Sequence, residues 1–356
     1  MLFNTEPKAS LSELYDRELE IERFKKGINE RLILVLGLRR IGKSSLVLSV
    51  LNSLSMDYLF IDVRKLYDNV SKKVPVERIY DELKSSLGKL SFKERLKDLI
   101  KDVDVSLGSV GIRLRPSETR NNIVRVFDAL NDVGKRIIIV FDEAQYLRYS
   151  TSGLRPLLAY IYDNLRNITL VLTGSEVGLL HDFLGIDDPS SELYGRYFFT
   201  VELTPFNREK SIDFLRRGFA ELNINVEDYV LEKAVNELDG IVGWLTYFGK
   251  LYLDKGLEAL DEVKELGINM VKSEIEELYS RSQYYQYIME AAATLEEAKW
   301  SDILRYIMAK TGRRPTNATL SRDLRNLVKM GFLIEVNDKY RIPDPIVKYA
   351  VLNMAR

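Results

Sequence analysis

The sequence predicts an α/β fold built on a five-stranded parallel sheet. Over residues 1–204, short apolar runs alternate with segments in which apolar residues recur at three- and four-residue spacing. The short runs are rich in β-branched and aromatic residues and show no polar alternation, so helices are expected to cover both faces of the sheet. The expected strands are Leu32–Leu36, Tyr58–Val63, Ile137–Phe141, Thr169–Thr173 and Phe198–Leu203.

A long insertion separates the second and third of these strands. Val76–Leu87 has the apolar spacing of a helix, and the alternating segment Val103–Leu114 predicts a small hairpin. Ser117, followed by an acidic residue, begins an amphipathic helix that is expected to run to about Val133. These elements complete a first domain over residues 1–204.

The remaining sequence predicts two further domains. After Pro205 the helical spacing continues to about Ser280 with few strand signals, which indicates a small helical domain over residues 205–282. Residues 283–356 contain three helices followed by a hairpin with an Asn-Asp turn, the order of a winged helix. The elements expected there are Tyr284–Thr294, Trp300–Lys310, Thr316–Met330, Phe332–Val336 and Lys339–Ile342.

The composition excludes several classes of protein. Hydrophobic residues make up 46% of the 356 residues and charged residues 29%, which favours a packed core over disorder. The absence of cysteine excludes disulfides, thiolate metal sites and a cysteine nucleophile, and the single histidine, His181, is expected in a solvated loop. No apolar run reaches the ~18 residues that cross a bilayer, and the first residues lack a signal-peptide pattern. We therefore expect a soluble cytoplasmic protein.

A phosphate-binding loop follows the first expected strand and precedes an apolar helix. Two glycines allow the backbone to curl so that successive N–H groups point into one concavity, and the helix N-terminus adds its positive end. In this motif the lysine reaches the β and γ phosphates, while the hydroxyl that follows it ligates Mg²⁺. The residues that fit G-x-x-x-x-G-K-[ST], with one further serine, are Gly37, Leu38, Arg39, Arg40, Ile41, Gly42, Lys43, Ser44 and Ser45.

Two adjacent acids end the third expected strand. Asp142 and Glu143 follow five apolar residues, so both should emerge at the carboxyl edge of the sheet, where ligands bind in open α/β folds. Asp142 is expected to hold Mg²⁺ and Glu143 to act as general base toward water. The alternative is a strand that ends in a solvated acidic turn. Because no guanine-reading N-K-x-D sequence is visible, ATP is the expected nucleotide.

Two further positions are candidates for catalysis. The fourth strand ends in Thr173-Gly174-Ser175, and Ser175 is expected to bond the γ-phosphate or the attacking water unless it only caps the strand. Arg196 precedes the fifth strand. It is a candidate arginine finger for the nucleotide of a neighbouring subunit, with a surface salt bridge as the alternative.

With these residues in place, the chain resembles the archaeal ATPase family of the AAA+ class, which is related to signal-transducing STAND ATPases and to origin-recognition ATPases. The phosphate loop is similar to the family form G-x-R-R-x-G-K-[ST]-S-L, and the resemblance covers essentially the whole chain. Further matching segments are Phe3…Glu6-Pro7-Lys8, Leu14-Tyr15-Asp16-Arg17-Glu18, Asp142-Glu143-Ala144-Gln145, Thr173-Gly174-Ser175, Leu193-Tyr194-Gly195-Arg196 and Leu203-Thr204-Pro205-Phe206.

The resemblance implies a P-loop core with strand order 5-1-4-3-2, a helical lid and a C-terminal winged helix. It also implies ATP hydrolysis with Mg²⁺, and it places Tyr15, Asp16 and Arg17 near the adenine. The sequence departs from the family in one place. Relatives carry Gly-Gly-x-Pro in the helical domain, whereas this chain reads Asp239-Gly240-Ile241-Val242 and lacks the proline, which puts the nucleotide-sensing role of that segment in doubt.

The C-terminal part of the chain is basic. Residues 299–356 contain twelve Lys and Arg against five Asp and Glu, a net charge of +7, whereas the whole chain carries −1. This charge and the winged-helix pattern favour DNA binding. The alternatives are a signalling switch whose winged helix contacts protein rather than DNA, and a nucleotide-binding scaffold with negligible turnover. A protein partner or a homo-oligomer of the chain is the alternative partner. The residues expected to face DNA are Arg313, Arg314, Thr316, Asn317, Thr319, Arg322 and Arg325.

Overall fold

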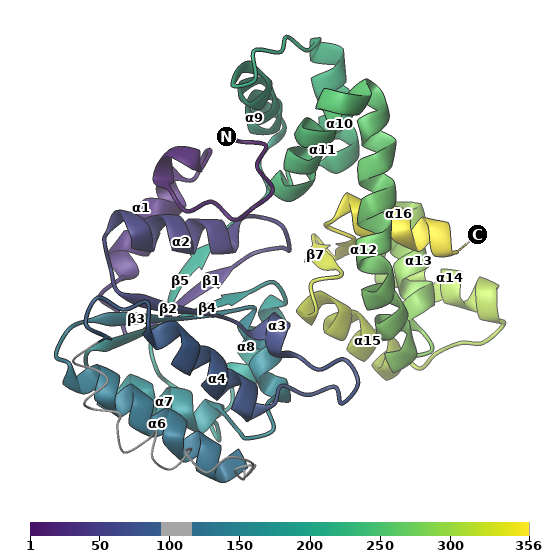
Figure 1. Cartoon of the computed structure of the whole chain (residues 1–356). Coiled ribbons are helices and arrows are strands. Elements are labelled where there is room, and N and C mark those ends of the chain that lie inside the picture. Colours follow the sequence, from purple (N-terminus) through teal and green to yellow (C-terminus); the bar gives the residue numbers. More distant parts are fainter. Residues whose placement is uncertain (94–115, 356) are drawn as a thin grey trace. The chain divides into compact units, whose positions relative to one another are not determined.

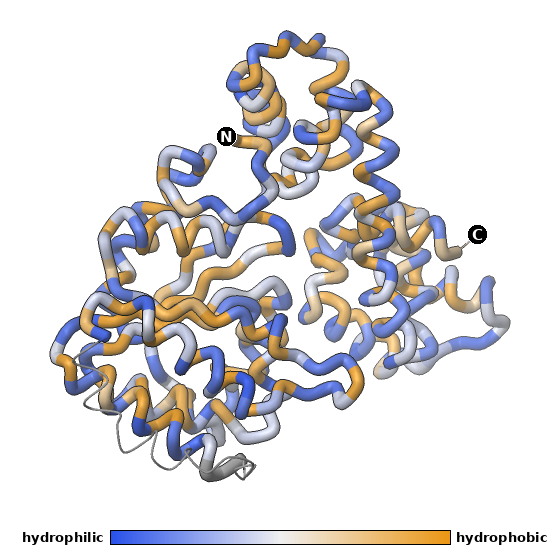
Figure 2. The backbone as a smooth tube through the Cα atoms, in the orientation of Figure 1, coloured by the Kyte–Doolittle hydropathy of each residue, from blue (hydrophilic) through white to orange (hydrophobic). Residues whose placement is uncertain are grey.

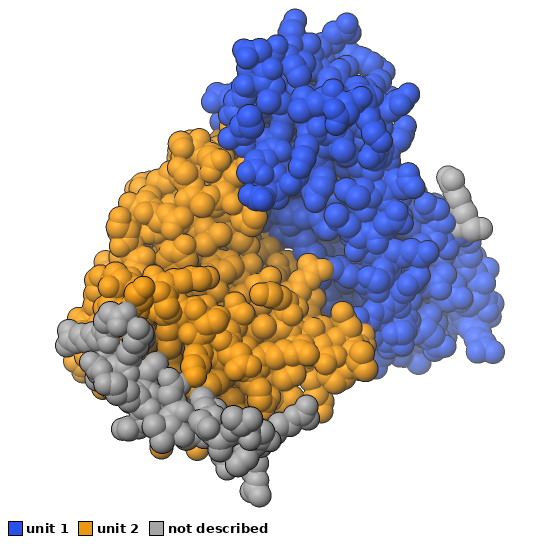
Figure 3. All heavy atoms as spheres, in the orientation of Figure 1, with its two compact units in different colours: residues 1–6, 38–42, 204–356 blue, residues 7–37, 43–203 orange. Residues whose placement is uncertain are grey.

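The computed structural model describes residues 1–93 and 116–355. The chain divides into two compact units, which Figure 3 colours orange and blue. The sheet unit contains residues 7–37 and 43–203, and the helical unit contains residues 1–6, 38–42 and 204–356. The hairpin expected at Val103–Leu114 lies outside the described residues.

A five-stranded parallel sheet forms the centre of the sheet unit (Figure 1). Its strand order is β2-β3-β4-β1-β5, which is 5-1-4-3-2 when counted from the opposite edge. The two descriptions are the same sheet, because a strand order has no direction. The strands are β1 (Leu32–Leu36), β2 (Tyr58–Asp62), β3 (Ile137–Asp142), β4 (Ile168–Gly174) and β5 (Phe199–Glu202).

The three central strands are buried along their whole length. Every residue of β1, β3 and β4 is buried, which explains why these runs show no polar alternation, and Figure 2 shows the hydrophobic residues gathered on the sheet. The edge strands β2 and β5 are only partly buried. In the sheet unit α1 and α2 lie on one face of the sheet, and α4, α6 and α7 lie on the other (Figure 1).

The other elements of the sheet unit follow the chain in the expected alternation. The predicted helix Val76–Leu87 is confirmed as α4, and α6 begins one residue before the predicted Ser117. The elements are η1 (Leu11–Glu13), α1 (Glu18–Gly27), α2 (Lys43–Ser53), α3 (Val63–Leu66), α4 (Val76–Leu87), α6 (Pro116–Asp132), η2 (Ala144–Tyr149), α7 (Arg155–Asn164) and α8 (Val177–Leu184).

Four of the five strands differ from their predicted bounds by one residue at one or both ends, and the prediction for His181 was wrong. The second strand ends at Asp62 rather than Val63, because the Asp62 side chain accepts a hydrogen bond from the Lys65 N–H and caps α3. His181 lies within helix α8 and is half-buried rather than in a solvated loop. Its burial lowers the pKa of the imidazole.

The parallel strands place their carboxyl ends at one edge of the sheet. Leu36, the last residue of β1, lies opposite Gly174 at the end of β4. Phe141 of β3 lies opposite Leu172 of β4. This register brings the start of the phosphate loop, the two acids after β3 and the hydroxyl residues at the end of β4 to one place, and it thereby sets up the candidate site.

The helical unit consists of helices and one small sheet of order β6-β8-β7. The three expected C-terminal helices and the hairpin are present within two residues of the predicted bounds. In the order of the chain, the elements are α9 (Arg208–Ala220), α10 (Asp228–Leu238), α11 (Val242–Lys255), η3 (Gly256–Glu258), α12 (Ala259–Arg281), α13 (Tyr285–Leu295), β6 (Ala298–Lys299), α14 (Trp300–Thr311), α15 (Asn317–Lys329), β7 (Ile334–Val336), β8 (Lys339–Arg341) and α16 (Pro345–Met354).

The first residues of the chain are part of the core of the helical unit. The ring of Phe3 is 6% exposed and packs edge-on against Phe214 and Phe219, with centroid distances of 6.0 and 4.9 Å. A Cβ at Gly218 or Gly249 would lie 2.2 or 2.3 Å from this ring, so α9 and α11 need glycine where Phe3 enters. No helix in the described part of the chain is long and apolar enough to span a membrane.

Candidate active site

The loop between β1 and α2 adopts the curled backbone that the motif predicts. Gly37 has φ 148° and Gly42 has φ 97°, values that residues with a side chain rarely adopt. The chain therefore turns at once from the end of β1 into the first turn of α2. The backbone N–H groups and the dipole at a helix N-terminus favour an anion.

Lys43 is buried at the base of this loop. It is the first residue of α2, it is 5% exposed, and its Nζ donates a hydrogen bond to the Gly37 carbonyl at 3.0 Å. The same ammonium lies 3.9 Å from Oε1 of Glu143. A buried ammonium group is costly without anionic partners. The arrangement accordingly favours binding of phosphate oxygens beside Lys43.

Ser44, which follows the lysine, and Asp142 form an all-oxygen pair. The Ser44 hydroxyl lies 3.1 and 2.9 Å from the two carboxylate oxygens of Asp142, and the Thr173 hydroxyl donates to Oδ1 of Asp142 at 2.5 Å. Hydroxyl and carboxylate oxygens are the hard ligands that Mg²⁺ prefers, and Mg²⁺ at nucleotide sites takes most of its other ligands from water and phosphate. The described residues contain no cluster of three or more His, Cys, Asp and Glu that could hold a metal without such help.

The surroundings of Asp142 disfavour its charged form. Burial is the largest cause and raises the pKa of the carboxyl to about 6, with smaller contributions in the same direction from the charges of Glu143 and Asp62. The hydrogen bonds from Thr173 and Ser44 act in the opposite direction. A cation bound at Ser44 and Asp142 would offset the free-energy cost of burying the charged carboxylate, so the donor set fits a divalent metal ion.

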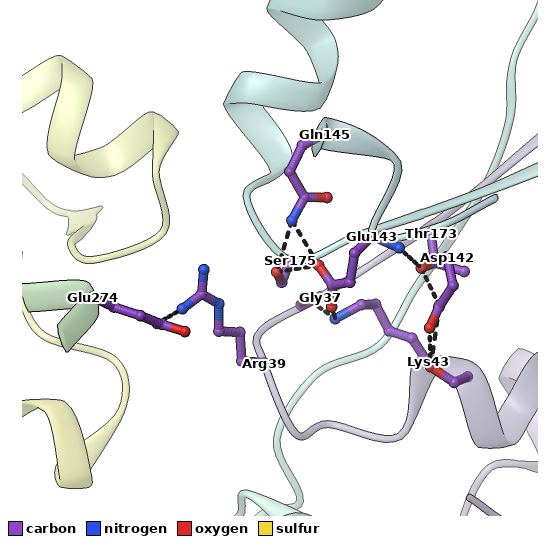
Figure 4. Close-up of polar contacts among 10 residues, drawn as sticks. Gly37, Arg39, Lys43, Asp142, Glu143, Gln145, Thr173, Ser175 and Glu274 are labelled. Atoms are coloured by element: carbon purple, nitrogen blue, oxygen red, sulfur yellow. Dashed lines mark hydrogen bonds and ion pairs between the residues drawn. The ribbon is translucent and has the colours of Figure 1, made fainter. Parts of the chain in front are cut away.

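Glu143 is held by two hydrogen bonds on one of its oxygens (Figure 4). Oε2 accepts a bond of 2.6 Å from the Gln145 amide and another of 2.6 Å from the Ser175 hydroxyl, and the same amide reaches the Ser175 oxygen at 3.2 Å. Oε1 is the oxygen that faces Lys43. Glu143 itself has φ 52°, a strained value for a residue with a side chain, and its N–H donates to the Thr173 hydroxyl at 3.0 Å.

Sequence reasoning found most of these residues but missed two roles. In the structure the Ser175 hydroxyl donates to Glu143, and its expected bond to the γ-phosphate or the attacking water stays a prediction. The contact of Thr173 with Asp142 and the position of Gln145 between Glu143 and Ser175 were not predicted. The spacing contained a signal for Gln145, because the second residue after Glu143 lies in the first turn of η2 and can fold back on that carboxylate.

Comparison with known proteins identifies the family of the chain. Residues 14–248 match the family described as "ATPase domain predominantly from Archaea". The chain belongs to this archaeal ATPase family. A solved structure, the Walker-type ATPase of Pyrococcus abyssi, has 38% sequence identity and a TM-score of 0.85, and the match covers 99% of this chain and 100% of that one.

More distant structures share the fold of this ATPase. The ORC2 protein of Aeropyrum pernix matches with a TM-score of 0.60 at 14% identity, over 100% of this chain and 98% of that one. The Cdc6 protein of Pyrobaculum aerophilum matches with a TM-score of 0.51 at 12% identity, over the same shares of the two chains. A comparison with curated proteins gave no match.

In the ATPase, Arg196 is engaged within its own chain. Its Nε and Nη2 donate to the two carboxylate oxygens of Asp163 at 2.9 and 2.6 Å, and its Nη1 donates to the Glu192 carbonyl. This hydrogen bonding to Asp163 raises the pKa of the guanidinium. The geometry is that of the salt bridge named as the alternative. Arg196 would have to leave Asp163 before it could reach a nucleotide elsewhere.

The segment expected near the adenine leads into α1. Arg17 is buried, it is the N-cap residue of that helix, and it forms an ion pair of 3.0 Å with Glu20. Tyr15 and Asp16 are half-buried, and Asp16 has φ 50°. The preceding turn is fixed to the phosphate-loop helix, because the Lys8 N–H donates to the Ser45 hydroxyl at 3.0 Å. The approach of Tyr15, Asp16 and Arg17 to an adenine stays a prediction.

Proposed function

We propose that this ATPase hydrolyses ATP with Lys43 on the phosphates, Ser44 and Asp142 on Mg²⁺, and Glu143 as the general base. The observation that carries the proposal is that the two carboxylate oxygens of Glu143 have different partners. Gln145 and Ser175 hold Oε2, while Oε1 lies toward Lys43, where a γ-phosphate would bind. A carboxylate fixed in this way can accept a proton from a water molecule without first reorienting.

The proposed reaction is an in-line displacement at the γ-phosphorus. The oxygen of the attacking water bonds to phosphorus as the bond to the β–γ bridging oxygen breaks, and the proton of that water passes to Oε1 of Glu143. Lys43 and the N–H groups of the loop bind the oxygens on which negative charge develops, and ADP leaves with the electron pair. Mg²⁺, when bound at Ser44 and Asp142, would neutralise charge on the β and γ phosphates.

Two substitutions test these roles. Lys43→Ala should abolish ATP binding, whereas Glu143→Gln should bind ATP with Mg²⁺ nearly as well as the wild type and lose hydrolysis by about a hundredfold or more. Glu22→Gln, an exposed glutamate in α1 that pairs with Lys25, is the matched control and should behave as the wild type. Equal turnover of the wild type and Glu143→Gln would show that the base is wrongly assigned. Unaltered ATP affinity of Lys43→Ala would contradict the phosphate site itself.

We further propose that residues 205–282 form a helical lid and that residues 283–356 form a winged helix that binds DNA. Helices α13 to α15 followed by the hairpin β7–β8 support the second assignment. Thr316 caps α15 by accepting a bond of 3.1 Å from the Thr319 N–H. Leu320, Leu324 and Leu327 face inward and are fully buried. Of the residues expected to face DNA, Thr319 is half-buried and the others are exposed: Arg313, Arg314, Thr316, Asn317, Arg322 and Arg325.

The basic residues of this surface differ in how available they are. Arg322 forms an ion pair of 3.0 Å with the buried carboxylate of Asp323, and this pair competes with a contact to a DNA phosphate. Arg313 and Arg314 lie in the exposed turn before α15 and are better placed for phosphate contacts. Positioning contacts of this kind raise affinity for any DNA sequence and make it depend on salt.

DNA binding titrated against salt tests this proposal. Wild-type protein should bind duplex DNA with a steep loss of affinity at higher salt, and Arg313→Ala with Arg314→Ala should reduce the slope by about two. The control pair is Arg216→Ala with Arg217→Ala, two exposed arginines of α9 that carry the same charge. Absence of salt-dependent binding would instead favour the signalling switch, in which this domain contacts protein.

A further inference from the structure

The apex of the phosphate loop, residues 38–42, is part of the helical unit and makes its contacts there with α11 and α12. The Gly243 N–H donates to the Arg40 carbonyl at 2.9 Å. A Cβ at Gly243 would lie 2.7 Å from Arg40 Cβ and 3.0 Å from its carbonyl oxygen, so a glycine is needed for this approach. Helix α11 begins at Val242 although the proline of the family pattern is missing. The segment that departs from the family is therefore the one that contacts the loop.

The Arg40 side chain lies on a buried tryptophan. Its guanidinium carbon is 4.2 Å from the centroid of a Trp244 ring, and its Nη2 lies 3.3 Å from the sulfur of Met270. Trp244 is fully buried, and its indole N–H donates to the carboxylate of Asp344 at 3.1 and 3.3 Å. Asp344 in turn caps α16, accepting a bond of 2.9 Å from Ile346. Arg40 is thus connected through one aromatic ring to the last helix of the chain.

The neighbouring arginine makes a second attachment. Arg39 forms an ion pair with Glu274 of α12 (Figure 4). Arg40 has φ 61°, a conformation that costs free energy in a residue with a side chain and persists only where surrounding contacts hold it. Gly243 and Trp244 contact Arg40 itself, and the ion pair of the adjacent Arg39 with Glu274 restrains the same stretch of the loop.

We propose that Gly243 and Trp244 are positioning residues of the ATPase, which hold Arg40 and with it the loop apex in the conformation that accepts the phosphates of ATP. The inference rests on nucleotide binding at this loop. Phosphates bind to loop N–H groups only when the backbone between the two glycines is curled, and Arg40 is the residue in that stretch whose backbone is strained. Linkage makes the effect reciprocal: a nucleotide that requires the curled apex strengthens the contact of Arg40 with Trp244.

The chain offers a direct spectroscopic test, because it contains only two tryptophans, Trp244 and Trp300. In a Trp300→Phe background, fluorescence reports on Trp244 alone. Saturating ATP with Mg²⁺, or an analogue that resists hydrolysis, should change the Trp244 emission, and Arg40→Ala should remove that change. The control is Arg23→Ala, because Arg23 also lies over an aromatic ring, at 5.5 Å from the centroid of Phe199. Emission that ignores saturating nucleotide would overturn the proposal.

Kinetics separate a positioning role from a purely structural one. Arg40→Ala and Gly243→Ala should raise the KM for ATP and the Kd of the analogue about tenfold, with kcat within about twofold, because Lys43 and Glu143 are untouched. Trp244→Phe should recover most of the affinity that Trp244→Leu loses. If Trp244→Leu is too unstable to purify, Arg40→Ala tests the same contact from its other side, through the KM for ATP and the Kd of the analogue.

The result with Lys43→Ala separates a failure of the phosphate site from a failure of the positioning role of Gly243 and Trp244. If Lys43→Ala loses ATP binding while Arg40→Ala and Gly243→Ala bind ATP as the wild type does, this inference fails and the phosphate site stands. If Lys43→Ala still binds ATP normally, the phosphate site itself is wrongly assigned, and the inference fails with it.

Discussion

Replacing Gln145 by leucine should slow ATP hydrolysis about ten- to a hundredfold and leave the affinity for ATP nearly unchanged. Gln145 is 1% exposed, and its amide nitrogen donates to Glu143 at 2.6 Å and to Ser175 at 3.2 Å. Leucine has a similar volume, branches one carbon nearer the backbone and has no hydrogen-bond donor. Glu143 would therefore keep its charge and lose one of the two bonds that fix its orientation.

The magnitude follows from the kind of bond that is lost. A hydrogen bond to a charged group contributes about 1.5–3 kcal/mol, and each 1.4 kcal/mol corresponds to a tenfold change in rate if the whole contribution orients the base. The effect on folding should be smaller. Among the described residues, Oε1 of Gln145 is buried without a hydrogen-bond partner, so leucine also removes an unsatisfied polar atom.

Steady-state phosphate release, with the affinity of an unhydrolysable analogue measured beside it, provides the assay. Gln286→Leu is the matched control, because Gln286 makes the same kind of amide–carboxylate bond, 2.8 Å to Glu290, in the helical unit. Ser175→Ala should have an effect of similar size, and the double variant should fall less than the product of the two, since both side chains act on one oxygen. A kcat within twofold of wild type for Gln145→Leu would refute this account of Glu143.

Three further predictions concern stability. Asp142→Asn should stabilise the nucleotide-free protein by about 3 kcal/mol above pH 6, because the pKa of Asp142 is raised from 3.8 to about 6 and wild-type stability falls as pH rises through that window. Thermal unfolding in EDTA should show no such fall for the variant. Phe3→Ala should lower the free energy of unfolding by about 2–4 kcal/mol, measured in urea, because it empties a buried aromatic site. Arg196→Ala should change the same quantity by less than about 1 kcal/mol, because its partner Asp163 is 44% exposed, and a larger loss would show that the ion pair is structural.

The sheet could be predicted from the sequence because its strands are short, apolar and buried on both faces. The first strand has the predicted bounds, and the others differ by one residue at one or both ends. The phosphate loop and the acids after β3 were predictable for a related reason. Their chemistry is contained in a few consecutive residues, such as Gly42-Lys43-Ser44 and Asp142-Glu143, and parallel strands bring their carboxyl ends to one edge of the sheet.

The contacts that complete the site could not be predicted in this way, because they join residues far apart in the chain. Ser175 meets Glu143 across 32 positions, and Thr173 meets Asp142 across 31. A hydroxyl at the end of β4 can face a phosphate or the neighbouring carboxylate, and only the twist and register of the two strands decide between these. The burial of Phe3 against Phe214 could not be predicted either, because its ring fits only where Gly218 and Gly249, on two different helices, lack a side chain.

The strained residues of the site show why its activity depends on distant parts of the chain. Arg40 and Glu143 have φ values of 61° and 52°, and the buried Asp142 carboxyl has a raised pKa, so each residue adds a local cost to the folded state. Thr173 supports Asp142 and Glu143 from another strand, and Trp244 supports Arg40 from a helix about two hundred residues further along the chain. A substitution at either support should therefore lower activity without touching the nucleotide, because it releases strain that the reaction needs to keep.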